Sequence, residues 1–238
     1  MNYKLKSKIA RLIPKSIKQM VILEHNEFLN YSLAQEGEDI ILNKLLKYKK
    51  DGFYIDIGAH HPFRFSNTYI FYKKGWRGIN IDAYPGSMIE FKKNRDKDIN
   101  LELGISSSNQ NLKFYCFNEP AYNTFNELEA KSKNEKDGIS LVNEIVIKTS
   151  PLSDVLDKYL PNSKTQIDFI SIDVEGFELE VLNSNNWEKY KPKFLLIEEL
   201  KKDLTQIINE SEVYKFLLGK NYKLVAKTYN TSFYQLND

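Results

Sequence analysis

The sequence IDFISIDVEGFELE, residues 167–180, contains a strand of the buried type followed by the start of a helix. Its apolar, β-branched run ends at Asp173, and Glu175 follows before an amphipathic segment. Parallel strands that are buried on both faces have such runs, and ligands of open α/β sheets bind just beyond their carboxyl ends. Two carboxylates at that edge are costly to desolvate unless the site needs negative charge or a base. The simpler alternative is an N-cap aspartate and a first-turn glutamate that stabilise the helix.

A second strand end of the same kind lies at residues 52–62, GFYIDIGAHHP, where apolar residues surround Asp56 and Gly58 opens a turn. Residues 75–85, GWRGINIDAYP, predict the next strand, with Asp82 at its end. This order of strand, glycine turn, helix, strand and acid is typical of a nucleoside-binding βαβ unit. The acid of such a unit accepts hydrogen bonds from the ribose hydroxyls. We therefore expect Asp82 to bind a ribose.

The glycine turn indicates which nucleoside this unit binds. A dinucleotide fingerprint needs three glycines, so that the backbone can approach the pyrophosphate. Here Gly58 is followed by Ala59, His60, His61 and Pro62. A ligand with a ribose, no phosphate and a cationic sulfonium fits better, because one glycine permits a close approach and nearby carboxylates suit the cation. The turn favours S-adenosylmethionine over a dinucleotide.

The composition predicts one folded domain. The chain has 238 residues, of which 42% are hydrophobic and 13% aromatic, so it can bury a substantial core. A net charge of +2 does not indicate a nucleic-acid partner. Cys116 is the single cysteine, so no disulfide can form within the chain. No run approaches the ~18 apolar residues of a membrane span, and the N-terminus lacks the features of a secretory signal. We expect a cytoplasmic protein.

Residues 1–31 are predicted to be a basic extension of a domain that occupies residues 32–238. The first 20 residues contain no acid and these basic residues: Lys4, Lys6, Lys8, Arg11, Lys15 and Lys18. Apolar residues recur among them at near-helical spacing. Such a segment can make weak peripheral contact with an anionic membrane or a partner. A solvated helix that packs one face on its own domain is the favoured alternative.

Alternating strand and helix patterns predict a Rossmann-like α/β domain. Helices are expected near 32–49, 66–74, 86–94, 153–159, 177–183 and 211–218, and strands at 53–57, 78–82, 99–103, 167–173 and 193–198. Two alternating runs around Asn230 predict a closing hairpin. Five βα repeats that end in a hairpin predict a seven-stranded, mostly parallel sheet with helices on both faces.

Residues 111–149 depart from this pattern and are predicted to form a β-rich excursion over the active site. For the charged stretch 127–138 within it we expect a mobile surface loop. Residues 118–125, NEPAYNTF, mix aromatic and amide side chains, which suit sugar recognition. The candidate substrate contacts are Tyr122, Asn123 and Thr124. A small satellite core is an equally favoured alternative for this segment.

Five segments together resemble the FkbM-type family of S-adenosylmethionine-dependent methyltransferases. They are QEGED (35–39), YIDIGAHHP (54–62), GWRGINID (75–82), NTF (123–125) and IDFISIDVEGFELEVL (167–182). The resemblance implies a class I Rossmann-like methyltransferase fold. It also implies O-methylation of hydroxyls, often on polysaccharide sugars or on polyketide and other secondary-metabolite scaffolds. The chain departs from many members at His60, His61 and Pro62, and has Asp82 where glutamate is common. These departures leave the acceptor open.

The candidate site residues follow from these motifs. For the cofactor we expect Asp56, Gly58, Ala59, His60, Asp82, Ala83, Gly104, Ile105, Gln35 and Glu38, with helix capping as an alternative for the last two. A sugar hydroxyl is a poor nucleophile, so a general base helps by ~10²–10⁴. His61 is the first candidate because histidine ordinarily titrates near neutral pH. Asp173 and Glu175 could instead act as the base, hold the acceptor's hydroxyls, or bind Mg²⁺ with Glu198 or His61. A metal is the less favoured of these roles.

Several functions remain as alternatives at this stage. The first is a nicotinamide-dependent oxidoreductase of Rossmann type, which the missing glycines disfavour. The second is a non-catalytic glycan-binding module that keeps the fold. The most favoured function is an O-methyltransferase that acts on a small-molecule or glycan hydroxyl. The expected acceptor is a sugar of a surface polysaccharide or its precursor. Self-association into a homo-oligomer stays open.

Overall fold

The computed structural model describes residues 30–134, 136–162, 165–200 and 203–237. The chain divides into two units, Met1–Tyr31 and Ser32–Asp238, and the second carries the features that follow. The predicted basic segment of residues 1–20 lies outside the described residues. No helix in the described part of the chain is both long and apolar enough to cross a membrane.

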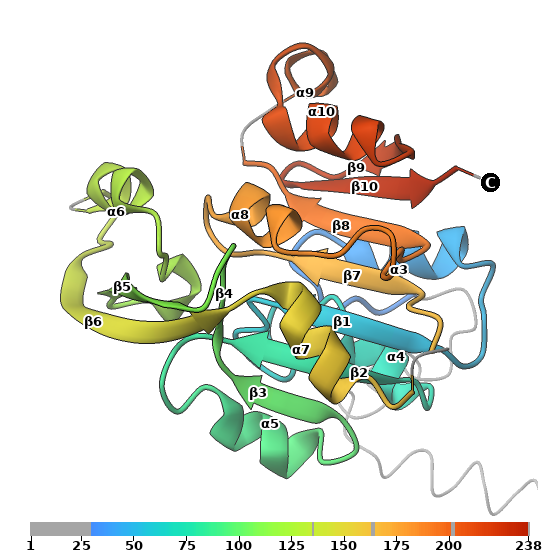
Figure 1. The fold of residues 1–238 in the computed structure, drawn as a ribbon, viewed down its shortest axis with the longest axis horizontal. Helices are drawn as coiled ribbons and strands as arrows, with labels where there is room; N and C mark the ends of the chain where they lie inside the picture. The colour runs from blue at the N-terminus through green and yellow to red at the C-terminus, as the bar shows by residue number, and fades with distance from the viewer. Residues whose placement is uncertain (1–29, 135, 163–164, 201–202, 238) are drawn as a thin grey trace, which may run out of the picture. The chain divides into compact units, whose positions relative to one another are not determined.

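The core of the second unit is a seven-stranded sheet with the order β3-β2-β1-β7-β8-β10-β9 (Figure 1). The strands are β1 (Phe53–Ile57), β2 (Arg77–Asp82), β3 (Ile99–Glu102), β7 (Phe169–Ile172), β8 (Phe194–Glu198), β9 (Tyr222–Lys227) and β10 (Thr231–Leu236). β10 pairs antiparallel with both β8 and β9, whereas the pairs among β1, β2, β3, β7 and β8 are parallel. This topology confirms the predicted mostly parallel sheet with its C-terminal hairpin.

Helices cover both faces of the sheet, because the buried strands carry apolar side chains on both sides. One core contains side chains of α7 (Leu152–Tyr159), α8 (Glu178–Asn183) and α10 (Glu212–Gly219), together with Ile55 of β1. The other contains α3 (Glu38–Leu45) and α4 (Tyr69–Lys73), together with Tyr54, which directly precedes Ile55 in the same strand. The remaining helices of this sheet's connections are α5 (Met88–Asn94) and α9 (Leu204–Glu210).

The register of the parallel strands brings the two sequence motifs to one edge. Ile57 of β1 pairs with Ile81 of β2 on one side and with Ile172 of β7 on the other. Ile172 in turn pairs with Ile197 of β8. The residues that follow these four positions therefore meet at the carboxyl edge of the sheet, where α/β proteins bind ligands.

The excursion forms its own three-stranded sheet, with the order β4-β6-β5. Its elements are β4 (Gly104–Ile105), β5 (Gln110–Phe117), the 3₁₀ helix η1 (Pro120–Tyr122), α6 (Glu127–Lys133) and β6 (Leu141–Ser150). Figure 1 shows β5, β6 and α6 projecting to the left of the seven-stranded sheet. The expected mobile loop at 127–138 is wrong for residues 127–133, because Asn126 caps a helix there by accepting hydrogen bonds from the Leu128 and Glu129 amides.

Some predicted helix boundaries are also wrong. Ser153, the first residue of the helix expected at 153–159, lies inside α7. The N-cap of α7 is Pro151, so the Ser153 hydroxyl does not cap this helix. The helix expected from residue 32 begins at Glu38, after Gly37 has adopted a left-handed backbone with φ 84°. The unpredicted helix α9 begins with a capping box between Asp203 and Gln206, a sequence signal that was available.

Candidate active site

A cleft of about 1510 Å³ runs along the carboxyl edge of the sheet, and the excursion forms one side of it. The sequence-predicted site residues that line the cleft are His61, Asp173, Glu175, Asp56, Gly58, Ala59, His60, Asp82, Ala83, Gly104, Ile105, Gln35, Tyr122 and Asn123. Glu38 and Thr124 are not among its lining residues. The edge of the sheet thus gathers residues from motifs that are far apart in the chain.

Glycine is required in the turn after β1 for a reason that the sequence did not indicate. Gly58 has φ 80°, and its amide donates to the Ile81 carbonyl at 2.9 Å. A Cβ at Gly58 would lie 1.7 Å from the carbonyl oxygen of Asp173. Glycine is therefore required here by the neighbouring strand end, whatever the cofactor also requires.

Asp82 stabilises the glycine turn after β1 as well as the turn that follows its own strand, β2. Its carboxylate accepts hydrogen bonds from the backbone amides of His60 and Tyr84, both at 2.8 Å. Burial raises the pKa of Asp82, and these two bonds partly oppose that rise. A carboxylate offers about four acceptor positions, so a ribose diol can still bind to it.

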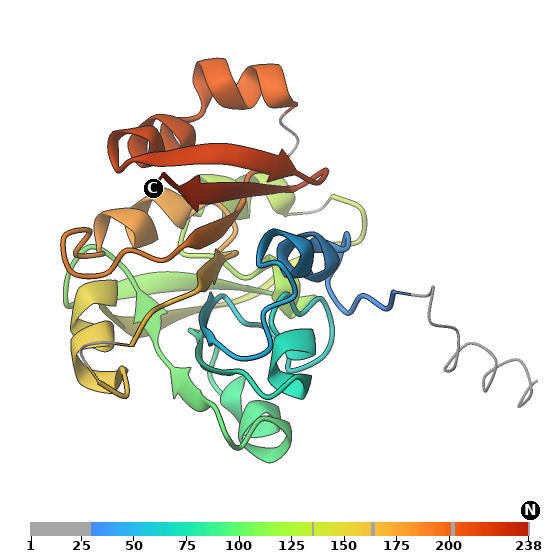
Figure 2. The same ribbon diagram turned by 90° about the vertical axis from the view of Figure 1, so that its right-hand side faces the viewer.

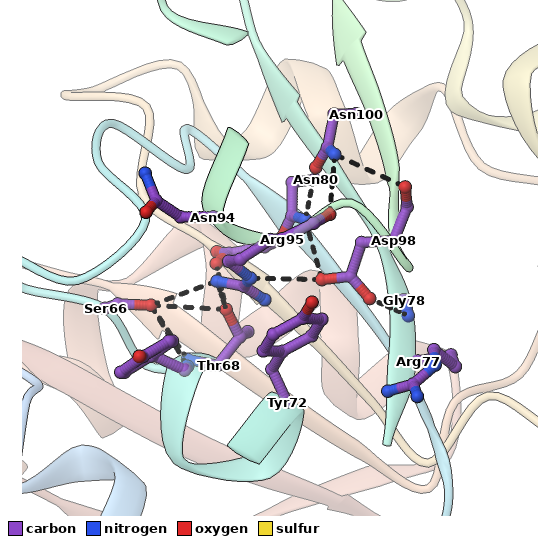
Figure 3. Close-up of polar contacts among 12 residues, drawn as sticks. Ser66, Thr68, Tyr72, Arg77, Gly78, Asn80, Asn94, Arg95, Asp98 and Asn100 are labelled. Atoms are coloured by element: carbon purple, nitrogen blue, oxygen red, sulfur yellow. Dashed lines mark hydrogen bonds and ion pairs between the residues drawn. The ribbon is translucent and has the colours of Figure 1, made fainter. Parts of the chain in front are cut away.

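Asp56 belongs to a buried polar network that extends to Arg95, at the C-terminal end of α5. The Thr68 hydroxyl donates to Asp56 at 2.6 Å and accepts from the Arg95 guanidinium at 3.0 Å. Arg95 is fully buried and also binds Asp98 at 3.0 Å, as Figure 3 shows. Burial raises the pKa of Asp56, whereas its bond to Thr68 and the charge of Arg95 lower it. The buried cation therefore fixes Asp56 through Thr68.

Three carboxyl groups converge beyond β7 and β8. One oxygen from each of Asp173, Glu175 and Glu198 lies within 4.8 Å of the others. Burial and the negative charge of Glu175 raise the pKa of Asp173 well above its ordinary value. Burial and the charge of Asp173 raise the pKa of Glu198 to about 12. An interaction between these two side chains contributes to both shifts, because it lowers the pKa of Asp173 and raises the pKa of Glu198.

Glu175 has a cationic partner from the excursion. The Lys133 ammonium forms an ion pair with the Glu175 carboxylate. A divalent metal bound to the three carboxyls would have to displace this ammonium from Glu175. The carboxyl cluster therefore already has a cation at Glu175, and the Mg²⁺ considered from the sequence stays a prediction.

His61 is poorly arranged to act as a base. Its Nδ1 accepts hydrogen bonds from the amides of Phe63 (3.1 Å) and Arg64 (3.0 Å) in its own loop. The neutral ring then carries its proton on Nε2 and has no free lone pair for a proton from the acceptor. These contacts indicate that His61 stabilises the conformation of its own loop.

The QEGED segment, residues 35–39, binds the β9–β10 hairpin through its glutamates. Glu38 accepts from the Glu36 amide at 2.8 Å and from the Thr231 hydroxyl at 3.2 Å, so its expected contact with a cofactor is not favoured. Glu36 accepts two hydrogen bonds from Asn230. These acids attach the segment to the turn of the β9–β10 hairpin, which Figure 2 shows in red near the top. Gln35 and Asn230 line the cleft as a result.

The NTF segment has divided roles. Thr124 is buried and its hydroxyl donates to the Glu175 carbonyl at 2.8 Å, so it stabilises the turn that follows β7. It does not line the cleft. The Asn123 Oδ1 accepts from the Phe117 amide at 2.8 Å. Its Nδ2 is buried at the cleft without a hydrogen-bond partner among the described residues, as is Nε2 of His60. Both atoms are available to a bound ligand.

Sequence reasoning missed two cleft residues that pair across long distances in the chain. Arg64 binds Glu119 through two hydrogen bonds of 3.0 and 3.1 Å, which join the His61 loop to the excursion. Lys133 was assigned to a loop. No local pattern signals either pair, because the two partners of each pair lie far apart in the chain.

Comparison with known proteins identifies the fold family. The model of the methyltransferase FkbM domain matches residues 56–224. No match was found among curated proteins.

Three of the solved structures that are similar to this chain are methyltransferases. A proposed O-methyltransferase from Klebsiella pneumoniae is 10% identical, with a TM-score of 0.45 over 98% of this chain and 96% of that one. The 1,6-didemethyltoxoflavin-N1-methyltransferase of Burkholderia thailandensis, solved with its substrate and S-adenosylhomocysteine, is 10% identical, with a TM-score of 0.45 over 100% and 92%. An O-methyltransferase from Bacillus cereus, solved with S-adenosylhomocysteine, is 12% identical, with a TM-score of 0.40 over 94% and 91%.

Proposed function

This chain belongs to the FkbM methyltransferase family, and from that premise we propose that it methylates a hydroxyl group of a sugar. The methyl donor in this proposal is S-adenosylmethionine, which supplies an electrophilic methyl group when it is bound. The acceptor would belong to a surface polysaccharide or its glycan precursor, and the reaction would take place in the cytoplasm. The observation that supports it most is the cluster of Asp173, Glu175 and Glu198 in a cleft that also has a nucleoside-type acid, Asp82.

The residues at the ends of β1 and β2 fit S-adenosylmethionine. Asp82 has acceptor capacity left for the ribose hydroxyls after binding two backbone amides. The buried Nε2 of His60 and Nδ2 of Asn123 have no partner among the described residues, and polar ligand groups would satisfy them. Burial lowers the pKa of His60, so its ring is neutral at neutral pH and adds no positive charge that would repel a sulfonium.

Asp173 is the group best placed to accept the acceptor's proton. Its raised pKa makes it a stronger base than an ordinary aspartate, and a base with a pKa near the working pH transfers protons most efficiently. Glu198 keeps its proton and donates a hydrogen bond to Asp173, which orients the basic oxygen. The acceptor O–H bond would break as the proton moves to the Asp173 carboxylate. The oxygen would form its bond to the methyl carbon while the bond from that carbon to the sulfur of the donor breaks, and S-adenosylhomocysteine would leave.

The surroundings of these acids favour a polyhydroxylated acceptor. Phe65, Tyr122 and Tyr229 line the cleft and are at least one-third exposed, so their rings can pack against the apolar face of a sugar. The nearby carboxyl groups can accept hydrogen bonds from hydroxyls. A phosphorylated group placed directly at Asp173 and Glu198 would instead be repelled.

A labelled-methyl assay tests this function. The full-length protein is incubated with methyl-labelled S-adenosylmethionine and a panel of nucleotide sugars, oligosaccharides and surface polysaccharides, and the products are identified by mass. We expect one methyl group on a sugar oxygen, and Asp173→Asn should lower kcat by ~10²–10⁴ while S-adenosylhomocysteine binding stays within a few-fold. Asp154→Asn, an exposed site on α7, is the matched control and should retain full activity.

Two outcomes would point to the alternatives. Tight binding of NAD without binding of S-adenosylhomocysteine, measured by calorimetry, would indicate an oxidoreductase. Glycan binding that Asp173→Asn leaves intact, with no methyl transfer by the wild-type protein, would indicate a non-catalytic module. Methylation of nitrogen or carbon in the panel would retain the methyltransferase and reject the hydroxyl acceptor.

A further inference from the structure

Helix α6 is attached to the turn that carries Glu175. The Asn126 side chain caps the helix with its oxygen, and its Nδ2 donates to the Gly176 carbonyl at 2.8 Å. The packing there is close, because a Cβ at Gly176 would lie 2.5 Å from Cγ of Glu129 on the same helix. The first turn of α6 is therefore docked on the residues that follow β7.

The last residue of α6 makes a second attachment to the same turn. Lys133 and Glu175 are paired while their side chains are only 13% and 11% exposed. The other acid near the ammonium is Glu129, at 4.0 Å, and the Tyr122 ring centre lies 5.7 Å away. Removing one partner of such a pair leaves an uncompensated charge in a poorly solvated place.

The backbone of this turn is in an unfavourable conformation. Glu175 has φ 56°, in the left-handed region that non-glycine residues seldom adopt. Three contacts from the excursion converge on Glu175 and Gly176: the Thr124 hydroxyl, the Asn126 amide and the Lys133 ammonium. Of these, only the Lys133 contact reaches the Glu175 carboxylate.

We propose that Lys133 is a positioning residue, which acts through Glu175 to hold the carboxyl groups of Asp173, Glu175 and Glu198 in their working arrangement. This inference rests on the proposed function, because the arrangement matters for proton removal from the acceptor. The excursion is then a part of the reaction centre, and α6 delivers the cation that holds the Glu175 carboxylate in place beside Asp173.

The role of Lys133 differs from that of a catalytic residue. Its ammonium is occupied by Glu175, so it acts on the reaction through that carboxylate. Loss of its charge should lower kcat more than it raises the KM for the acceptor. It should leave the cofactor end of the cleft, at Asp82, undisturbed. Arginine at the same position should retain most of the wild-type turnover, because it keeps a positive charge there.

The test compares Lys133→Met, Lys133→Arg and a control on the same helix. Lys131 is the control, because it lies two residues away and pairs with Glu127 on the exposed surface. With the acceptor found by the labelled-methyl assay, we expect Lys133→Met to lower kcat by ~10–100-fold. Lys133→Arg should stay within about five-fold of the wild type, Lys131→Met should be unchanged, and all should bind S-adenosylhomocysteine normally.

A second comparison tests whether Lys133 acts through Glu175. If it does, Lys133→Met combined with Glu175→Gln should be no slower than Glu175→Gln alone, because both single changes remove the same pair. Additive losses would overturn the proposal. So would a Lys133→Met variant with wild-type turnover, or a Lys133→Arg variant as slow as Lys133→Met.

Hydrogen exchange separates this proposal from the proposed function. Even if no sugar acceptor is methylated, Lys133→Met should speed amide exchange at residues 174–177, whereas Lys133→Arg and Lys131→Met should not. Unchanged exchange in Lys133→Met would reject the positioning role. The absence of methylated sugar in the wild type, with the exchange result as expected, would reject only the proposed acceptor.

Discussion

Gly58 and Asp173 are in such close contact that a Cβ on the glycine would lie 1.7 Å from the aspartate's carbonyl oxygen. The contact joins the turn after β1 to the end of β7, the two motifs that define the site. The glycine is needed for the approach of two strand ends, so a substitution there should disturb the reaction centre and the cofactor end together.

Gly58→Ala should destabilise the protein by several kcal/mol. It combines an unfavourable positive φ, which costs about 1–2 kcal/mol, with a clash against backbone that cannot move freely. Gly37→Ala is the control, since Gly37 has a similar φ of 84° and a Cβ there would meet nothing within 4 Å. Urea denaturation of the two variants should show a loss of only about 1–2 kcal/mol at Gly37. Equal losses at the two positions would show that the clash relaxes.

The pH dependence of turnover should reflect Asp173. Because its raised pKa keeps it protonated at low pH, kcat/KM should rise with pH along a limb that lies well above the ordinary range of aspartate. Glu175→Gln should move that limb to lower pH, because the negative charge of Glu175 is one cause of the rise. The measurement is a pH–rate profile of both proteins. A limb that stays in place in the variant would show that Glu175 does not act on the base.

Asp82→Asn should weaken S-adenosylhomocysteine binding by about 10-fold, equivalent to ~1.4 kcal/mol. The substitution removes charge-assisted hydrogen bonds to the ribose and weakens the hold on the amides of His60 and Tyr84. Glu102→Gln, at the exposed end of the neighbouring strand β3, is the control for charge at this edge. Calorimetry should find wild-type affinity in the control. Unchanged affinity in Asp82→Asn would place the ribose elsewhere.

Glu178 should make the protein less stable as the pH rises. Burial raises the pKa of Glu178 from 4.5 to about 7, so the folded state holds a proton that the unfolded state releases. Stability from this group is therefore complete below about pH 4.5 and is lost as the pH rises to about 7, by up to roughly 3 kcal/mol. Glu178→Gln should flatten this part of the curve in urea denaturation, whereas Glu180→Gln, an exposed acid on the same helix, should leave its slope unchanged.

Much of the site could be predicted because strand ends carry local signals. The apolar runs before Asp82 and Asp173 identified buried parallel strands, and parallel strands necessarily place their carboxyl ends at one edge. The topology and the cleft then follow from the order of elements along the chain. Motif residues such as Gly58 and Asp82 were predicted for this reason, and both line the cleft.

Other features could not be predicted, because they depend on which side chains meet. His61 had the residue type of a base, but its loop uses Nδ1 for two backbone amides. Thr124 had the type of a sugar contact, but it binds the Glu175 carbonyl. The charged segment of Lys133 was typical of a mobile loop, yet Asn126 caps it as a helix on the strand-ending turn.

The fold class, the strand ends and the acids that follow them could be predicted from the sequence, because hydrophobic periodicity and turn residues act over short distances along the chain. The surroundings of those acids exist only in the folded chain. The cluster of Asp173 with Glu198, the ammonium on Glu175 and the need for glycine at position 58 all arise from burial and from contacts between distant segments. The pKa values of these groups depend on desolvation and neighbouring charge, which exist only once the chain has folded.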